Sequence, residues 1–220
     1  MKTDSFLKRE WIGITFLIIP FIMLFYLWED LPEKIPVHWN VDGKVDRSSE
    51  KGWELFMLPL INVFTYLMIT ISYYIDPKKK LKFSTNAVTI LKTTVAVFMT
   101  ILFSIMLAIS LGYPISMPDV VQYGIILLFM VIGNYLSKIR PNYFMGIRTP
   151  WTLENEEVWR KTHRLGGKIW VFGSVILLVT KIILANHLPA PLFLGFILAM
   201  SFIPVIYSYI AFKKLEKKNA

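Results

Sequence analysis

The residues best suited to binding or catalysis lie in two polar segments. The first holds His38 and a group of acidic residues, and the second holds His163 close to several arginines. The acidic segment could coordinate a cation or receive a basic peptide. His163 could in principle act as a general base, and the arginines could bind lipid phosphates or an acidic partner. The plainer alternative is that both histidines only satisfy nearby backbone groups and that the arginines only set the membrane topology.

The sequence lacks the elements of known catalytic sites. It has no His-Glu-x-x-His element, no paired carboxylates within an apolar run and no Gly-rich phosphate loop. It also has no cysteine, which excludes thiol chemistry and cysteine-based metal sites. We therefore assign no catalytic residue and no metal ligand, and we expect no cofactor.

A β-hairpin is expected to position the first segment. Apolar and polar residues alternate over residues 37–41, which is the period of a strand. Asp42-Gly43 predicts a two-residue turn, because glycine accepts the positive φ that such a turn needs. Trp39 should then face lipid or the helix ends. The opposite strand face would present His38, Asn40 and Asp46.

The second segment, residues 138–168, predicts a short amphipathic helix. The residue before Pro150 is disfavoured in a helix, and Thr152 is a good N-cap for a helix that starts directly after it. Acidic and basic residues then occur at the i,i+4 spacing of helical ion pairs. We expect an interfacial helix over Thr152–Leu165, which Gly166-Gly167 stops or bends before the next span.

Long apolar runs surround both segments. The chain has 220 residues, of which 55% are hydrophobic. A bilayer core about 30 Å thick needs roughly 20 apolar residues of helix. The predicted fold is therefore an all-α integral membrane protein with six transmembrane helices, a small extracellular β-hairpin loop and a cytoplasmic interfacial helix. The predicted spans are residues 11–28, 55–75, 91–111, 120–137, 169–186 and 188–212.

Two charged residues, Lys92 and Lys181, fall within predicted spans. Each lies near the end of its span, so we expect its amine to extend to the headgroup region. The alternative is a charge that has a function inside the membrane.

The distribution of positive charge predicts the orientation. Basic residues concentrate in the N-terminal segment, in the loops after the second and fourth spans and in the C-terminal tail. The opposite side carries only Lys34, Lys44, Arg47 and Lys51. By the positive-inside rule, the chain is a multi-pass protein of the cell membrane with both termini in the cytoplasm. The net charge of +9 then reflects topology, and we expect no direct nucleic-acid binding.

Two motifs resemble the SdpI family of bacterial membrane proteins. Residues 146–153 read Gly-Ile-Arg-Thr-Pro-Trp-Thr-Leu, and they are followed by Val158-Trp159 and Thr162-His163-Arg164-x-Gly166-Gly167-Lys168. The run Leu31-Pro32-x-x-Ile35-Pro36-Val37-His38-Trp39-Asn40-x-x-Gly43-x-x-Asp46 resembles the small domain of unknown function that often opens such proteins. On this basis we divide the chain into residues 1–75, with two spans and the extracellular loop 29–54, and an SdpI-like region, residues 76–220, with four spans and the cytoplasmic motif loop 138–168.

The resemblance implies immunity to a secreted, membrane-active peptide toxin. It also implies that the toxin-bound protein holds a cytoplasmic transcriptional repressor at the membrane. Besides the lipid bilayer, the implied partners are thus a peptide toxin outside and a repressor inside. The residues predicted to bind the cytoplasmic partner or ligand are Asn142, Arg148, Trp151, Thr152, Trp159, His163 and Arg164. The residues predicted to bind the extracellular ligand are His38, Trp39, Asn40 and Asp46.

Two other functions stay open at this point. A small exporter could form a path in a dimer, although the sequence does not indicate the oligomeric state. The polar residues for such a path are Asn62, Thr65, Gln122 and Asn134. A membrane enzyme could instead use His163 and the neighbouring arginines on a lipid headgroup.

Overall fold

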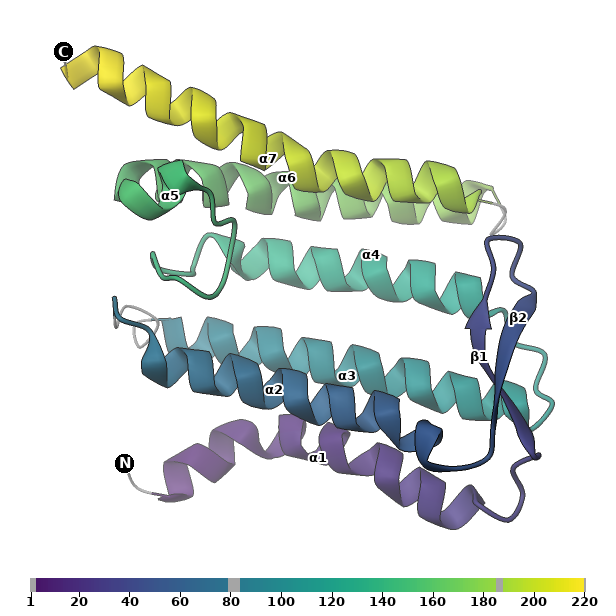
Figure 1. The fold of residues 1–220 in the computed structure, drawn as a ribbon. Coiled ribbons are helices and arrows are strands. Elements are labelled where there is room, and N and C mark those ends of the chain that lie inside the picture. Colours follow the sequence, from purple (N-terminus) through teal and green to yellow (C-terminus); the bar gives the residue numbers. More distant parts are fainter. Residues whose placement is uncertain (1–2, 79–83, 185–187, 220) are drawn as a thin grey trace. The chain divides into compact units, whose positions relative to one another are not determined.

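A computed structural model describes residues 3–78, 84–184 and 188–219 of the chain (Figure 1). Its helices are α1 (Thr3–Leu27), α2 (Met57–Ile75), α3 (Thr85–Ser110), α4 (Met117–Leu136), α5 (Pro150–Glu154), α6 (Glu156–Ile183) and α7 (Ala190–Asn219). A 3-10 helix, η1 (Trp53–Phe56), precedes α2. The strands are β1 (Lys34–Trp39) and β2 (Val45–Glu50).

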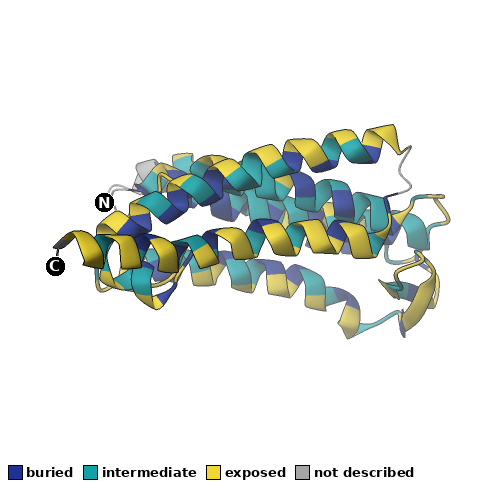
Figure 2. Ribbon diagram, turned by 90° about the horizontal axis from the view of Figure 1, so that it is seen from above, coloured by how far each residue is buried: buried dark blue, intermediate teal, exposed yellow. Residues whose placement is uncertain are grey.

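Six helical segments in the described part of the chain are long and apolar enough to cross a membrane. They are Lys8–Leu27, Trp53–Ile75, Thr85–Ser110, Met117–Leu136, Glu156–Ile183 and Ala190–Lys218. Exposed positions recur along these helices (Figure 2), and they include large apolar side chains such as Phe25 and Phe172. Lipid, unlike water, accommodates such side chains. The predicted six-span helical fold with its hairpin is confirmed, although several spans begin earlier than predicted.

The chain forms two compact units, each with its own core. The first comprises Met1–Met68 and Lys92–Gly124, and the second comprises Ile69–Leu91 and Ile125–Ala220. Helices α2, α3 and α4 therefore contribute residues to both units. The predicted division of the sequence into residues 1–75 and 76–220 stays a prediction.

The hairpin packs onto the core of the first unit. Strands β1 and β2 are antiparallel, with Trp39 opposite Val45. Ile35 is fully buried in a cluster that includes Phe103 and Leu107 of α3, and the partly buried Trp39 packs against the same cluster. Trp39 was expected to face either lipid or the helix ends, and in the structure it packs against the helix ends.

The turn of the hairpin differs from the predicted one. The Asn40 N–H donates to the Lys44 carbonyl at 2.9 Å, and the Gly43 N–H donates to the Asn40 carbonyl at 3.0 Å. Val41 and Asp42 are thus the central residues, and Gly43 follows with a φ of 77°. The prediction of a two-residue turn centred on Asp42-Gly43 is wrong, although the predicted positive φ of Gly43 is confirmed. The Asn40 side chain explains the longer loop, because its Oδ1 accepts from the N–H groups of Asp42 and Lys44.

The prediction that the two lysines extend to the headgroups is wrong. Lys92 is buried, and its Nζ lies 2.7 Å from Oε2 of the equally buried Glu10. The Tyr66 hydroxyl donates to the same oxygen at 2.6 Å, and Arg9 Nε donates to Oε1 at 3.0 Å. Lys181 is buried as well. The ion pair and its hydrogen bonds compensate Lys92 for lost solvation, so its amine has no need to reach water.

Close helix contacts organise the second unit. Helices α6 and α7 lie side by side (Figure 1), and Trp170 Nε1 donates to the Met200 carbonyl at 3.0 Å. A Cβ on Gly167 would lie 2.6 Å from the carbonyl oxygen of Gly133, so α4 and α6 approach closely there. The predicted stop at Gly166-Gly167 is wrong, because α6 runs unbroken from Glu156 through both glycines to Ile183. Small side chains are needed here for packing, and packing outweighs the low helix propensity of glycine.

Some predicted features lie outside the described residues. They comprise Asn186 at the predicted end of the fifth span and the basic residues Lys2, Lys79, Lys80 and Lys82.

We expect Glu10→Gln to destabilise the protein by about 3–5 kcal/mol, because it leaves the buried ammonium of Lys92 without its carboxylate. The double variant Glu10→Gln/Lys92→Met should recover most of this loss. Thermal unfolding in detergent micelles measures both effects. As a control, Glu216→Gln removes an exposed ion pair with Lys213 and should change little. Equal stability of the single and double variants would contradict this account of the cluster.

Candidate functional site

The loop between α4 and α6 is ordered by one buried amide, that of Asn142. Its Nδ2 donates to the carbonyls of Arg140 and Met145 at 2.9 and 3.0 Å. Its Oδ1 accepts from the N–H groups of Phe144 and Met145 at 2.8 and 2.7 Å. An irregular segment must find partners for its backbone groups, and here a single side chain supplies four of them. Asn142 therefore fixes the shape of the loop.

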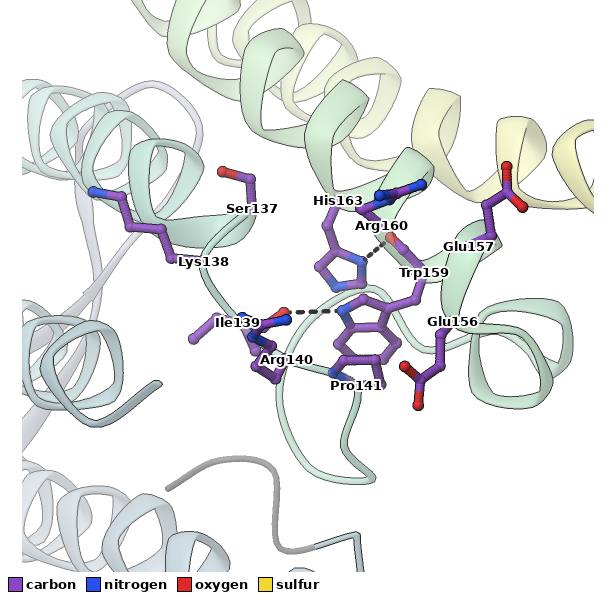
Figure 3. Close-up of a pocket in the computed structure, with 10 residues that line it drawn as sticks. All are labelled: Ser137, Lys138, Ile139, Arg140, Pro141, Glu156, Glu157, Trp159, Arg160 and His163. Atoms are coloured by element: carbon purple, nitrogen blue, oxygen red, sulfur yellow. Dashed lines mark hydrogen bonds between the residues drawn. The ribbon is translucent and has the colours of Figure 1, made fainter. Parts of the chain in front are cut away.

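His163 and Trp159 attach this loop to α6 (Figure 3). The two rings stack with centroids 4.0 Å apart, and both side chains are almost fully buried. Trp159 Nε1 donates to the Ile139 carbonyl at 2.9 Å. His163 Nε2 accepts from the Ile147 N–H at 3.0 Å, which leaves Nδ1 to donate to the Trp159 carbonyl at 2.8 Å. Both ring nitrogens are thus engaged in the neutral form, so the ring has no free base to offer a substrate.

Gly146 makes the contact with His163 sterically possible. Its φ is 100°, a conformation that residues with a Cβ rarely adopt. A Cβ at this position would also collide with Nε2 of His163, the atom that accepts from Ile147. Glycine is therefore required both by the backbone and by the space beside the histidine.

Two consecutive caps shape the end of the loop. Thr149 caps α5, and the Thr149 and Thr152 hydroxyls each accept from the other residue's backbone N–H. Asn155 caps α6 through bonds from the N–H groups of Glu157 and Val158. The predicted N-cap at Thr152 and a separate helix over Thr152–Leu165 are wrong. Pro150 is the physical reason, because its fixed φ and missing N–H suit the first helical position and leave Thr149 as the cap.

The Thr149 cap also connects the loop to α7. Its Oγ1 lies 3.0 Å from Oγ of Ser208, and both residues are buried. Beside this contact, the half-buried ring of Trp151 packs against Tyr209, with centroids 5.1 Å apart. The loop is thus fixed to both α6 and α7.

The C-terminal end of α2 supplies a further anchor that the sequence did not reveal. Oδ1 of the buried Asp76 accepts from the Tyr143 N–H at 3.2 Å. Lys78 Nζ donates to the Leu153 carbonyl at 2.8 Å and lies 5.0 Å from the centre of the Tyr143 ring. In the sequence Lys78 contributed only to the charge count, because its loop partners are distant along the chain.

The seven predicted cytoplasmic residues thus separate by exposure. Arg148 and Arg164 are exposed, and Trp151 is half-buried. The other four are buried and hold the loop in place: Asn142, Thr152, Trp159 and His163. A binding role for any of the seven stays a prediction. In this conformation the first three present accessible side chains, whereas Asn142 and Thr152 are enclosed and Trp159 and His163 show only an edge to a cleft.

A cleft of about 660 Å³ opens beside the histidine–tryptophan stack (Figure 3). Trp159 and His163 form part of its wall. Its charged rim carries Lys138, Arg140, Arg160, Glu156 and Glu157. Such a rim can bind a polar or acidic surface by hydrogen bonds and ion pairs.

The predicted extracellular residues also take different roles. His38 Nδ1 lies 2.6 Å from Oδ1 of Asp46, and both side chains are exposed on the hairpin. Asn40 shapes the turn, and Trp39 packs on the core. In the described part of the chain, no group of three or more histidine, aspartate or glutamate residues could hold a metal ion.

Comparison with known proteins finds a match for each of the two segments. Residues 138–208 match the SdpI/YfhL protein family, and residues 15–63 match a domain of unknown function, DUF1648. The resemblance to the SdpI family is confirmed. The chain is also 28% identical over 213 residues to a protein of Bacillus subtilis (strain 168) named immunity protein SdpI. This alignment covers 96% of the chain and 99% of the relative. No solved structure matches the chain.

The matches fall on the two candidate segments. The SdpI/YfhL match contains the motif loop, α5, α6 and the part of α7 that reaches Ser208. The DUF1648 match contains the hairpin and parts of α1 and α2. Asn142, Thr149, Trp159 and His163 thus lie within the SdpI/YfhL match, whereas the anchors Asp76 and Lys78 lie outside it.

We expect Gly146→Ala to loosen the motif loop, because the new Cβ displaces His163 from the Ile147 N–H and strains a backbone with positive φ. Hydrogen exchange of residues 140–149 should rise, while the protein still inserts into the membrane. Gly195→Ala is the matched control, since a Cβ there meets nothing within 4 Å. Unchanged exchange in Gly146→Ala would show that the histidine contact does not hold the loop.

Proposed function

We propose that this chain is a membrane immunity protein that protects the cell from a secreted, membrane-active peptide. The observation that carries the proposal is the nearly end-to-end match to the Bacillus subtilis immunity protein. Such a match includes both the hairpin and the motif loop, rather than a shared membrane anchor alone. Protection by binding also agrees with a six-span layout that leaves polar surfaces at the ends of the spans.

In the proposed orientation, both termini and the motif loop lie in the cytoplasm and the hairpin lies outside. The asymmetry of lysine and arginine supports this orientation. The peptide toxin then meets the hairpin first. The exposed His38–Asp46 pair there offers a polar surface with a carboxylate, which suits a basic peptide.

The motif loop is the proposed docking surface for a cytoplasmic repressor. Arg148 is exposed, and its Nη1 donates to the Tyr143 carbonyl at 2.7 Å. This is the one hydrogen bond that the described residues give its side chain, so further guanidinium N–H groups can bind a carboxylate. The buried hydrogen bonds of Ile147, Thr149 and Thr152 fix the backbone that carries Arg148 and Trp151.

Two observations weaken the alternatives. A headgroup-cleaving enzyme would need His163 as its general base, but both ring nitrogens of His163 are engaged and the ring is buried. Asn62 is not available to line an export path, because its Nδ2 donates to the Ala96 carbonyl and to Thr100 Oγ1 within the first unit. Of the other three path residues, Gln122 is buried, Thr65 is half-buried and Asn134 is exposed.

Expression of the chain should raise survival of a Bacillus subtilis strain that lacks its own immunity protein and is challenged with the secreted peptide.

We expect Arg148→Lys to lower repressor retention at the membrane or survival, because lysine cannot reproduce the planar fork of arginine. Membrane levels should stay near normal, since all six spans are intact. The matched control is Lys214→Arg, which keeps the charge of an exposed cation on α7. A lysine variant that performs like the wild type would show that the arginine only sets topology.

Reporter fusions test the orientation separately. A phosphatase that is active only outside the cytoplasm should be active when fused at Ser116, between α3 and α4, and inactive after Ala220. A fluorescent protein that folds only in the cytoplasm should give the opposite pattern. Activity of the phosphatase after Ala220 would overturn the proposed topology.

A further inference from the structure

A second groove, of about 300 Å³, lies between α4 and α6 in the second unit. Its floor is the close helix contact at Gly133 and Gly167. Asn134 of α4 and Ser137, directly after that helix, line it on one side, and both are exposed. The α6 side is lined by Arg164, Lys168, Val171 and Phe172.

The lining changes from charged to apolar along α6. Arg164 and Lys168 are exposed one turn apart, and neither has an ion-pair partner among the described residues. Residues 169–180 carry no charge. The two cations are therefore the last exposed charges before α6 enters its apolar stretch, where Phe172 is 66% exposed.

This order matches the cross-section of one leaflet of a bilayer. The charged end of the groove lies at headgroup level, and the apolar end lies in the hydrocarbon region. We propose that the groove binds one anionic phospholipid. Arg164 and Lys168 bind its phosphate group, with Asn134 and Ser137 as further hydrogen-bond donors, and an acyl chain packs along Val171 and Phe172.

The apolar end favours a lipid over the other anions that a cationic pair could bind. A free phosphate or an acidic protein segment would use the two cations but would gain nothing from exposed apolar side chains at membrane depth. This proposal is independent of the immunity function, because it concerns the lipid that surrounds the protein.

Native mass spectrometry of the purified protein tests the proposal with phosphatidylglycerol, phosphatidylcholine and glycerol 3-phosphate as probes. We expect phosphatidylglycerol to bind about tenfold more tightly than phosphatidylcholine, given the attraction of two cations. The variant Arg164→Gln/Lys168→Gln should remove this preference. Asn134→Asp should weaken this preference as well, because the new carboxylate on α4 repels the lipid phosphate while α6 is unchanged. Glycerol 3-phosphate, which lacks acyl chains, should not displace the lipid.

The charge-matched control is Lys214→Gln/Lys217→Gln, which removes two exposed cations of α7 that do not line the groove. It should retain the preference for phosphatidylglycerol. Three results would each overturn the proposal. The first is that the wild type binds the two lipids equally well. The second is that the α6 and α7 variants lose the preference for phosphatidylglycerol to the same extent. The third is that glycerol 3-phosphate displaces the lipid.

Discussion

The motif loop depends on a single constraint, which is that an irregular segment packed among helices must find side chains to satisfy its backbone groups. Asn142 supplies four hydrogen bonds, and the caps at Thr149 and Asn155 satisfy the starts of α5 and α6. His163 accepts from the Ile147 N–H and so joins the loop to α6. The Ile147 N–H is buried, and a buried donor without a partner costs about 1–3 kcal/mol. The surface that the loop presents is therefore a consequence of its interior.

The same constraint governs the charges inside the first unit. Glu10 and Lys92 come from α1 and α3, and Tyr66 comes from α2, so one polar cluster joins three helices. In an apolar environment such a cluster specifies which helix faces meet, because any other arrangement leaves a charge unpaired. The first unit thus combines a polar contact at Glu10 with an apolar cluster around Ile35 beneath the hairpin.

Features that depend on local sequence could be predicted, and features that depend on distant partners could not. Long apolar runs predicted the six spans, four of them free of charge. Alternation predicted that His38 and Asp46 share a face of the hairpin. The Thr149 cap could also have been predicted, since threonine before proline is a common helix start. By contrast, nothing near Lys92 in the sequence points to Glu10. The role of His163 was hidden as well, because the N–H that it accepts from is placed only by the full path of the loop.

The division between buried and exposed motif residues determines which experiments can distinguish folding from binding. Loss of function in a variant of Asn142 or His163 is ambiguous, because these side chains hold the loop and its surface changes when they are removed. Arg164 is different, since it is exposed and the described residues give its side chain no hydrogen bond within the loop. Arg148 is exposed as well, but its Nη1 also donates to the Tyr143 carbonyl. A substitution that keeps the charge at Arg164 therefore reports on recognition itself, whereas one at Arg148 also tests the hydrogen bond to Tyr143. A sequence motif of this kind contains residues that hold the loop in shape and residues that are exposed for binding. Only the fold shows which residues are which.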